Sequence, residues 1–161
     1  YLTAYTIQLL NIWSIPDFVK WKLTNKWKLL NTWPQGGGMI DNHLAYWPPQ
    51  LNCKALPLDF KKKVTEKYEA FYPWLEENWE LSGAPTKEAF MENNYTIDRL
   101  KGIASFMNAE DWSVRLPETA EWCYRVAEER GQDFDAIFPE LSWLQDYHKP
   151  NNDFPLVINT V

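Results

Sequence analysis

The chain has 161 residues, a net charge of −6, and a composition that is 45% hydrophobic and 24% charged. This length corresponds to one domain, and this balance is typical of a folded globular protein rather than a disordered one. The acidic charge disfavours nucleic-acid binding, because a phosphate backbone is bound through clustered Lys and Arg. No apolar run approaches the roughly 20 residues of a membrane span. Two cysteines and no recognisable signal peptide predict a cytoplasmic protein.

The first third of the chain predicts a strand followed by a helix. Residues 1–11 (YLTAYTIQLLN) are β-branched, aromatic and almost uncharged, as in a strand that is covered on both faces. The run Ser14-Ile15-Pro16-Asp17 has the spacing of a capping box, and we expect a helix from there to about Leu23. Residues 27–33 allow a short strand. The glycines at 36–38 lack the spacing of a phosphate-binding loop and predict an irregular turn.

The middle of the chain predicts a second strand and the longest helix. Residues 42–47 form the strand candidate, which Pro48 and Pro49 end because proline cannot donate to a ladder. Pro57 then begins a helix that continues to about residue 79, and Pro73 predicts a kink or a break in it near Tyr72. Apolar residues at spacings of three and four place one face of this helix inward: Phe60, Val64, Tyr68, Phe71, Tyr72, Leu75 and Trp79.

The last part of the chain predicts helices only. Thr86 and Thr96 are expected to cap two helices, and Pro117 begins another that ends near Arg130, with Gly131 as the C′ residue. Strands alternating with helices indicate an α/β fold with a parallel sheet. We therefore expect strand–helix units over residues 1–81, a helical extension over 82–146 and an extended tail over 147–161.

The sequence offers no strong candidate for a catalytic or metal-binding residue. His43 and His148 stand alone, and a site formed by Asp41 and His43 is less favoured than a polar strand end. Cys53 is a weak candidate for a nucleophile, since only two histidines are available as its base. We therefore predict no catalytic residue and no metal ligand.

One position in the predicted sheet does point to ligand binding. In α/β proteins ligands bind where parallel strands end at their carboxyl side. That edge would present Gln8, Asn11 and Asn52, whose amides can donate to and accept from a ligand. The alternative is that these amides cap turns, and the residues alone do not separate the two interpretations.

Three segments of the chain resemble a known family. They are LLNIWSIPDFVKW (residues 9–21), HLAYWPPQLNCKALPLDFKKKVTEKYEAF (43–71) and AEERGQDFDAIFPEL (127–141). In their order and spacing they are similar to the C-terminal half of radical S-adenosylmethionine enzymes with a twitch- or SPASM-like C-terminal region. The resemblance implies a partial (β/α) barrel fragment with few strands and a helix-rich C-terminal extension. It also implies that Gln8 and Asn11, at the end of the first strand, line the adenosine or methionine side of the S-adenosylmethionine.

The chain departs from that family at the feature that carries the chemistry. The family holds a [4Fe–4S] cluster in a CxxxCxxC loop, which is absent here, and Cys53 and Cys123 cannot replace it. S-adenosylmethionine and the cluster are therefore expected by resemblance only, and no cofactor is expected in this chain alone. Whether the chain is an enzyme stays open.

Two functions follow from these observations. The first is the C-terminal portion of a radical S-adenosylmethionine protein that is not catalytic by itself. The alternative is a non-enzymatic small α/β binding or assembly module that self-associates through aromatic surfaces. The chain begins at Tyr1 without a methionine, and two or three strands are few for an independent sheet and would leave an open edge. We therefore expect either a missing N-terminal half or a homo-oligomer. We expect neither a nucleic acid nor a membrane as a partner.

Overall fold

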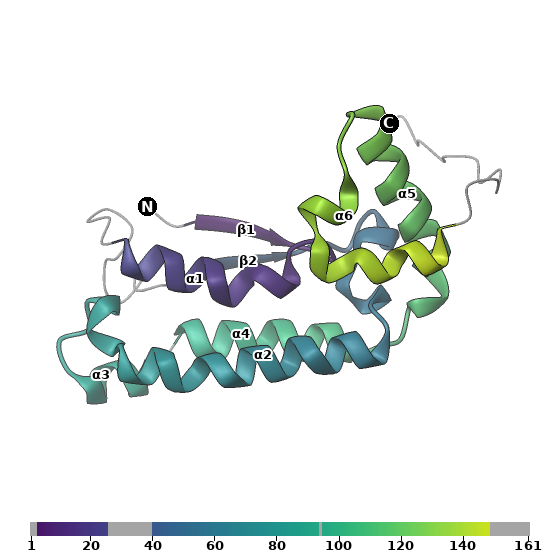
Figure 1. Ribbon diagram of the computed structural model, residues 1–161. Helices are drawn as coiled ribbons and strands as arrows, with labels where there is room; N and C mark the ends of the chain where they lie inside the picture. The colour runs from purple at the N-terminus through teal and green to yellow at the C-terminus, as the bar shows by residue number, and fades with distance from the viewer. Residues whose placement is uncertain (1–2, 26–39, 94, 149–161) are drawn as a thin grey trace.

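The computed structural model describes residues 3–25, 40–93 and 95–148 (Figure 1). The strands and helices follow one another as β1 (Thr3–Ile7), α1 (Ile15–Thr24), β2 (Ile40–Leu44), α2 (Leu58–Glu77), α3 (Lys87–Glu92), α4 (Tyr95–Asn108), α5 (Leu116–Glu129) and α6 (Phe134–Ile137). Short 3₁₀ segments connect them, among which η1 (Ile12–Ser14), η2 (Pro49–Leu51), η3 (Cys53–Ala55) and η6 (Pro139–Tyr147) matter below. The predicted strand at 27–33 and the turn at 36–38 lie outside the described residues.

The two strands form a parallel pair, with Ile7 opposite Leu44 at its carboxyl end. The predicted parallel pairing is therefore confirmed, although both strands are shorter than expected. Beyond the paired residues, the two segments that follow the strands remain hydrogen-bonded to each other. The N–H of Ala45 donates to the carbonyl of Ile7, and the N–H of Leu9 donates to the carbonyl of Leu51, both at 2.8 Å. These bonds bring the turns that follow β1 and β2 to one place.

The prediction of an α/β fold that forms a partial (β/α) barrel fragment is wrong. Within the described residues the sheet has two strands, and helices dominate the fold. After β2 the chain enters 3₁₀ turns at Pro49 instead of a further strand, and the described residues from 58 onward are helices and turns. A two-stranded ribbon cannot curl and close as a barrel does, so its stability depends on the helices packed against it.

The local helix signals were right in part. Thr96 lies inside α4 and does not precede it, and the side chain of Ser14 does not cap α1. Thr86 caps α3, since its Oγ1 accepts the N–H of Ala89 at 3.1 Å, and Gly131 has a left-handed φ of 63° just after α5. Of the predicted kink or break near Tyr72, the break is wrong, because α2 continues past Pro73 to Glu77. Pro73 and Glu69 are both exposed, so the carbonyl that loses its helical donor lies on the water-facing side of the helix.

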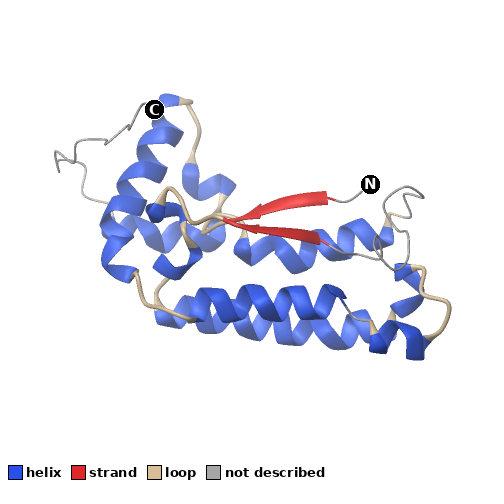
Figure 2. Cartoon of the chain, turned by 180° about the vertical axis from the view of Figure 1, so that it is seen from behind, coloured by secondary structure: helices blue, strands red, loops and turns tan. Residues whose placement is uncertain are grey.

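The helices cover the strands on one side and at one end. α2 and α4 lie side by side beneath the strand pair, and both strands point toward α5 and α6 (Figures 1 and 2). One hydrophobic cluster extends from Ile7 in β1 to Leu144 in η6. At its centre Tyr68 is fully buried, and its hydroxyl donates to the carbonyl of Ile12 at 2.7 Å. Helix α2 thereby holds the turn that leaves β1.

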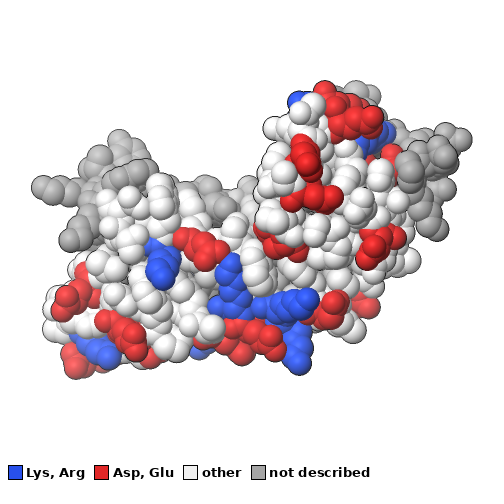
Figure 3. All heavy atoms as spheres, in the orientation of Figure 1, with Lys and Arg blue, Asp and Glu red and all other residues white. Residues whose placement is uncertain are grey.

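The surface carries mixed charge. On the face seen in Figure 3, Lys and Arg gather over α2 but are interspersed with acidic side chains. Lys67 pairs with Asp17 at 2.5 Å, and Lys62 lies 3.8 Å from Glu66. No helix among the described residues combines the length and the apolar character needed to cross a membrane.

Candidate functional site

A pocket of about 300 Å³ lies at the carboxyl end of β1, where α5 and α6 meet the turn after the strand. We call it the edge pocket. Its lining residues are mostly apolar: Leu10, Trp122, Cys123, Val126, Ala127, Arg130, Gln132, Phe134, Ile137 and Phe138. The pocket is at the edge of a parallel pair where α/β proteins commonly bind ligands.

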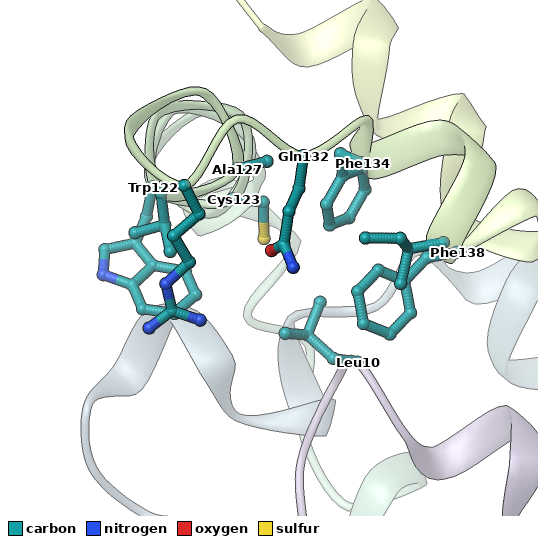
Figure 4. A pocket seen from close by; sticks show the side chains of 10 residues that line it. Leu10, Trp122, Cys123, Ala127, Gln132, Phe134 and Phe138 are labelled. Atoms are coloured by element: carbon teal, nitrogen blue, oxygen red, sulfur yellow. The ribbon is translucent and has the colours of Figure 1, made fainter.

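Helix α5 and the turn after it provide one wall of the pocket and an amide in its lining, that of Gln132. Trp122 and Val126 are four residues apart, as are Cys123 and Ala127, so all four lie on one face of the helix. Gly131 then reverses the chain, and the N–H of Gln132 donates to the carbonyl of Ala127 at 2.8 Å. In Figure 4 the amide of Gln132 points into the pocket between Cys123 and Phe134.

The opposite wall is held by α6. Asp133 caps this helix by accepting the N–H of Ala136 at 3.1 Å. The ring of Phe134 contacts Phe138, with 5.2 Å between the ring centroids, and Tyr124, with 5.0 Å. The hydroxyl of Tyr124 donates to Asp135 at 2.7 Å, so α5 and α6 are also joined by a hydrogen bond. The walls of the pocket are therefore formed before any ligand binds.

The edge pocket has little capacity for nucleophilic chemistry. Burial raises the pKa of the Cys123 thiol to about 12, so the thiolate is scarce at neutral pH. Among the described residues that line it, there is no histidine and no carboxylate. The polar groups it does offer are the Gln132 amide and the guanidinium of Arg130, an exposed residue. This combination suits the binding of an apolar group with a polar or anionic end.

Two of the predicted site residues lie beside the edge pocket without lining it. The Asn11 Oδ1 accepts the N–H of Gln8 at 3.0 Å, and its Nδ2 donates to the carbonyl of Thr6 at 2.9 Å. Both ends of the Asn11 amide are therefore engaged by the backbone of the turn that follows β1. Leu10, which lies between the two predicted residues, is the one whose side chain reaches the pocket.

Asn52, the third predicted residue, is fully buried. Its Oδ1 accepts the N–H of Lys54 at 2.9 Å and so caps η3. Its Nδ2 has no hydrogen-bond partner among the described residues. Asn52 does not line the edge pocket, although the neighbouring Leu51 is bonded to Leu9.

The weaker candidates are not assembled into a reactive site. Burial raises the pKa of Cys53 to about 12, against the smaller opposing effect of nearby lysines. His148 stacks on Tyr124, and its Nε2 lies 3.4 Å from a carboxylate oxygen of Glu121. The part of the chain that the structure describes contains no group of three or more potential metal ligands. Since a [4Fe–4S] cluster needs several thiolates, these residues do not fit one.

Most of the edge pocket was not foreseen from the sequence. Trp122, Gln132 and Phe138 come from segments that look like an ordinary amphipathic helix and the turns after it. The usable signal was Gly131, because a C′ glycine sends the next residue back toward the helix it follows. The tertiary contact with Leu10, more than a hundred residues away, has no counterpart in the local pattern.

Comparison with known proteins adds no relative. No protein-family model, no curated protein and no solved structure matches this chain. The residues and their geometry are therefore the basis for the functional argument.

Proposed function

We propose that this chain is a binding module that takes up an apolar small molecule, or an apolar group of a larger one, in the edge pocket without converting it. The observation that supports this proposal is the pocket itself. It has a volume of about 300 Å³, it is lined mostly by apolar side chains from separate segments, and the amide of Gln132 points into it. A preformed apolar cavity with few polar groups is typical of ligand sites. The raised pKa of the Cys123 thiol supports binding rather than nucleophilic catalysis.

The polar groups suggest the chemical class of the ligand. The Gln132 amide donates and accepts, so it suits a carboxylate, an amide or a hydroxyl. Arg130 adds a positive charge to the lining and favours a carboxylate over its neutral counterparts. An aromatic or branched aliphatic carboxylic acid is the ligand class that combines these features.

Saturation-transfer NMR with phenylacetate and its neutral counterpart phenylacetamide tests this proposal. We expect saturable binding of both probes, with phenylacetate tighter, and loss of that preference in Arg130→Gln. Val126→Phe should weaken both probes by about tenfold or more because the larger side chain fills the pocket. Val114→Phe is the matched control, since Val114 is 85% exposed and lies outside this pocket.

Absence of saturable binding to the wild-type chain would contradict the proposal. Equal affinities of Val126→Phe and the wild type would contradict the assignment to this pocket. Because Val126 is only half-buried, its variant should keep the wild-type circular dichroism spectrum. Gln132→Leu offers a second test on an exposed residue and should remove the hydrogen bond while leaving apolar contacts.

A second candidate function is the C-terminal portion of a radical S-adenosylmethionine protein. The observation in its favour is that the segments carrying the resemblance meet in space: Leu10 and residues 130–138 line one pocket, and Leu9 is hydrogen-bonded to Leu51. The test is the reading frame upstream of Tyr1. An in-frame CxxxCxxC motif would support this candidate, whereas a start codon directly before Tyr1 would refute it. Under this candidate the edge pocket would serve a larger protein.

A further inference from the structure

A second surface, on the opposite end of α5 from the edge pocket, exposes several large apolar side chains together. Tyr46, Trp47, Trp112 and Val114 line a shallow pocket of about 420 Å³. Tyr46 is 63%, Trp47 74% and Val114 85% exposed. We call these four residues the aromatic platform. Large apolar side chains that gather on a surface mark an interaction site more often than isolated ones do.

The aromatic platform is held in place from below. The Trp112 Nε1 donates to Glu110 at 2.9 Å, and Lys54 pairs with the same carboxylate at 2.5 Å. The Lys54 ammonium also lies over the rings of Phe106, at 4.6 Å from its centroid, and Trp112, at 5.3 Å. Phe106 in turn meets Tyr46 edge to face, with 5.2 Å between centroids. The rings of Trp112 and Tyr46 are thus ordered in advance, which reduces the entropy lost on binding.

An acidic pocket adjoins the platform. It has a volume of about 580 Å³, shares Asp111 and Val114 with the platform pocket, and adds Asp59 and the exposed Leu58. The backbone N–H of Ser113 donates to Asp111 and holds the pKa of that carboxyl below its usual range. Arg115, on the platform side, is already paired with Glu118 at 3.1 Å. Lys61, which is buried, acts electrostatically on Asp111 but lines neither pocket. The two pockets together therefore place the carboxylates of Asp59 and Asp111 beside exposed rings.

Exposed aromatic rings next to carboxylates indicate which kind of partner binds this surface. A second copy of the chain would bring its own Asp59 and Asp111 to a symmetric interface, where like charges repel. A nucleic acid would meet the same negative charge. Exposed Tyr and Trp rings are the surface on which proline-rich segments dock, because a polyproline II helix is preformed and presents flat rings. Carboxylates next to such rings suit a Lys or Arg in the same segment.

We propose that the aromatic platform and the adjoining acidic pocket bind an extended, proline-containing segment of a partner protein that carries a lysine or an arginine. The prolines pack on Tyr46 and Trp47, and the basic side chain reaches Asp111. The contact is independent of the edge pocket and of the ligand proposed for it.

Fluorescence polarisation with labelled polyproline peptides tests this proposal. One peptide ends in two arginines, one in two alanines and one in two glutamates. We expect the arginine peptide to bind most tightly and the glutamate peptide least. Trp47→Ala should weaken the arginine peptide by about tenfold or more, since a central aromatic residue carries much of the affinity of such a contact. Trp21→Ala, which removes an exposed tryptophan of α1, is the matched control.

Asp111→Asn separates the charge from the shape of the site. It keeps an oxygen for the Ser113 N–H, so it should weaken the arginine peptide and leave the alanine peptide unchanged. Three results would overturn the proposal: no saturable binding of the arginine peptide, equal affinity for all three peptides, or unchanged affinity in Trp47→Ala. Light scattering that shows a dimer in the wild type and a monomer in Trp47→Ala would also overturn it, in favour of a second copy as the occupant.

Discussion

The hydroxyl of Tyr68 offers a direct test of how α2 holds the turn that leaves β1. Tyr68 is fully buried, and its hydroxyl donates to the carbonyl of Ile12 at 2.7 Å. In a regular helix that carbonyl would accept the N–H four residues later, but residue 16 is a proline and has none. Tyr68→Phe removes the hydroxyl, and with it the hydrogen bond to Ile12, while it keeps the ring and its packing.

The expected cost follows from the acceptor that remains. A buried carbonyl that loses its partner costs about 1–3 kcal/mol. In a protein of about this size, 1 kcal/mol corresponds to a change in melting temperature of about 2–4 °C. We therefore expect Tyr68→Phe to lower the free energy of unfolding by about 1–3 kcal/mol and the melting temperature by about 2–12 °C.

Urea denaturation followed by circular dichroism measures this difference, with thermal melting as a second assay. Tyr72→Phe is the control on the next turn of the same helix, because the Tyr72 hydroxyl has no hydrogen bond to a described residue. A loss for Tyr68→Phe below about 0.5 kcal/mol, or equal losses for the two variants, would refute the role given to this hydrogen bond.

Three further predictions concern buried and paired groups. Burial raises the pKa of Cys53 and Cys123 from 9.0 to about 12, so the reactive thiolates are scarce in the native protein. We therefore expect both thiols to react with a disulfide reagent about a thousandfold more slowly in the native protein than in guanidinium, as measured by absorbance at 412 nm. Fast reaction of the native protein would contradict the burial of these thiols. In the folded protein the pKa of the Glu110 carboxyl lies below its ordinary value of 4.5, mainly because Lys54 donates a hydrogen bond to it. The ionised carboxylate therefore stabilises the fold at pH values above 4.5, and this stabilisation is lost as the pH falls through the lower pKa of the folded state. The melting temperatures of the wild type and Glu110→Gln should therefore differ at neutral pH and converge below about 4.5, whereas a difference that stays constant with pH would refute this. Leu100→Ala in the core should cost about 2–5 kcal/mol by urea denaturation, against little for the exposed Leu58→Ala, and similar costs would contradict the burial of α4.

The parts of the fold that were predictable are those written in local patterns. The apolar spacing over α2 repeats at three and four residues, and Phe60, Val64 and Tyr68 are buried as that spacing requires. Thr86 and Gly131 mark helix ends because the cap geometry needs those residue types. Each of these inferences depends on neighbours within one or two turns of the chain, so the sequence carries them directly.

The prediction of the fold class was wrong because it depended on how many strands assemble into the sheet, and local sequence patterns do not encode that number. Residues 42–47 suggested a strand, but its paired part is Ile40–Leu44, and the chain then turns at Pro49. The resemblance added strands that the described residues do not contain. The aromatic platform was unpredictable for a related reason, since Lys54 and Glu110 meet across 56 positions of sequence.

The two candidate surfaces share one helix, and this determines how they have to be tested. Arg115, at the start of α5, lines the platform pocket, while Trp122 and Val126, farther along, line the edge pocket. Between them the Thr119 hydroxyl donates to the carbonyl of Gln50 at 2.7 Å and fixes the helix to η2. A ligand in either pocket binds the folded state and raises the stability of the whole domain by mass action. A thermal shift alone therefore cannot assign a ligand to one pocket, and only paired variants such as Val126→Phe and Trp47→Ala, measured by affinity, can separate them.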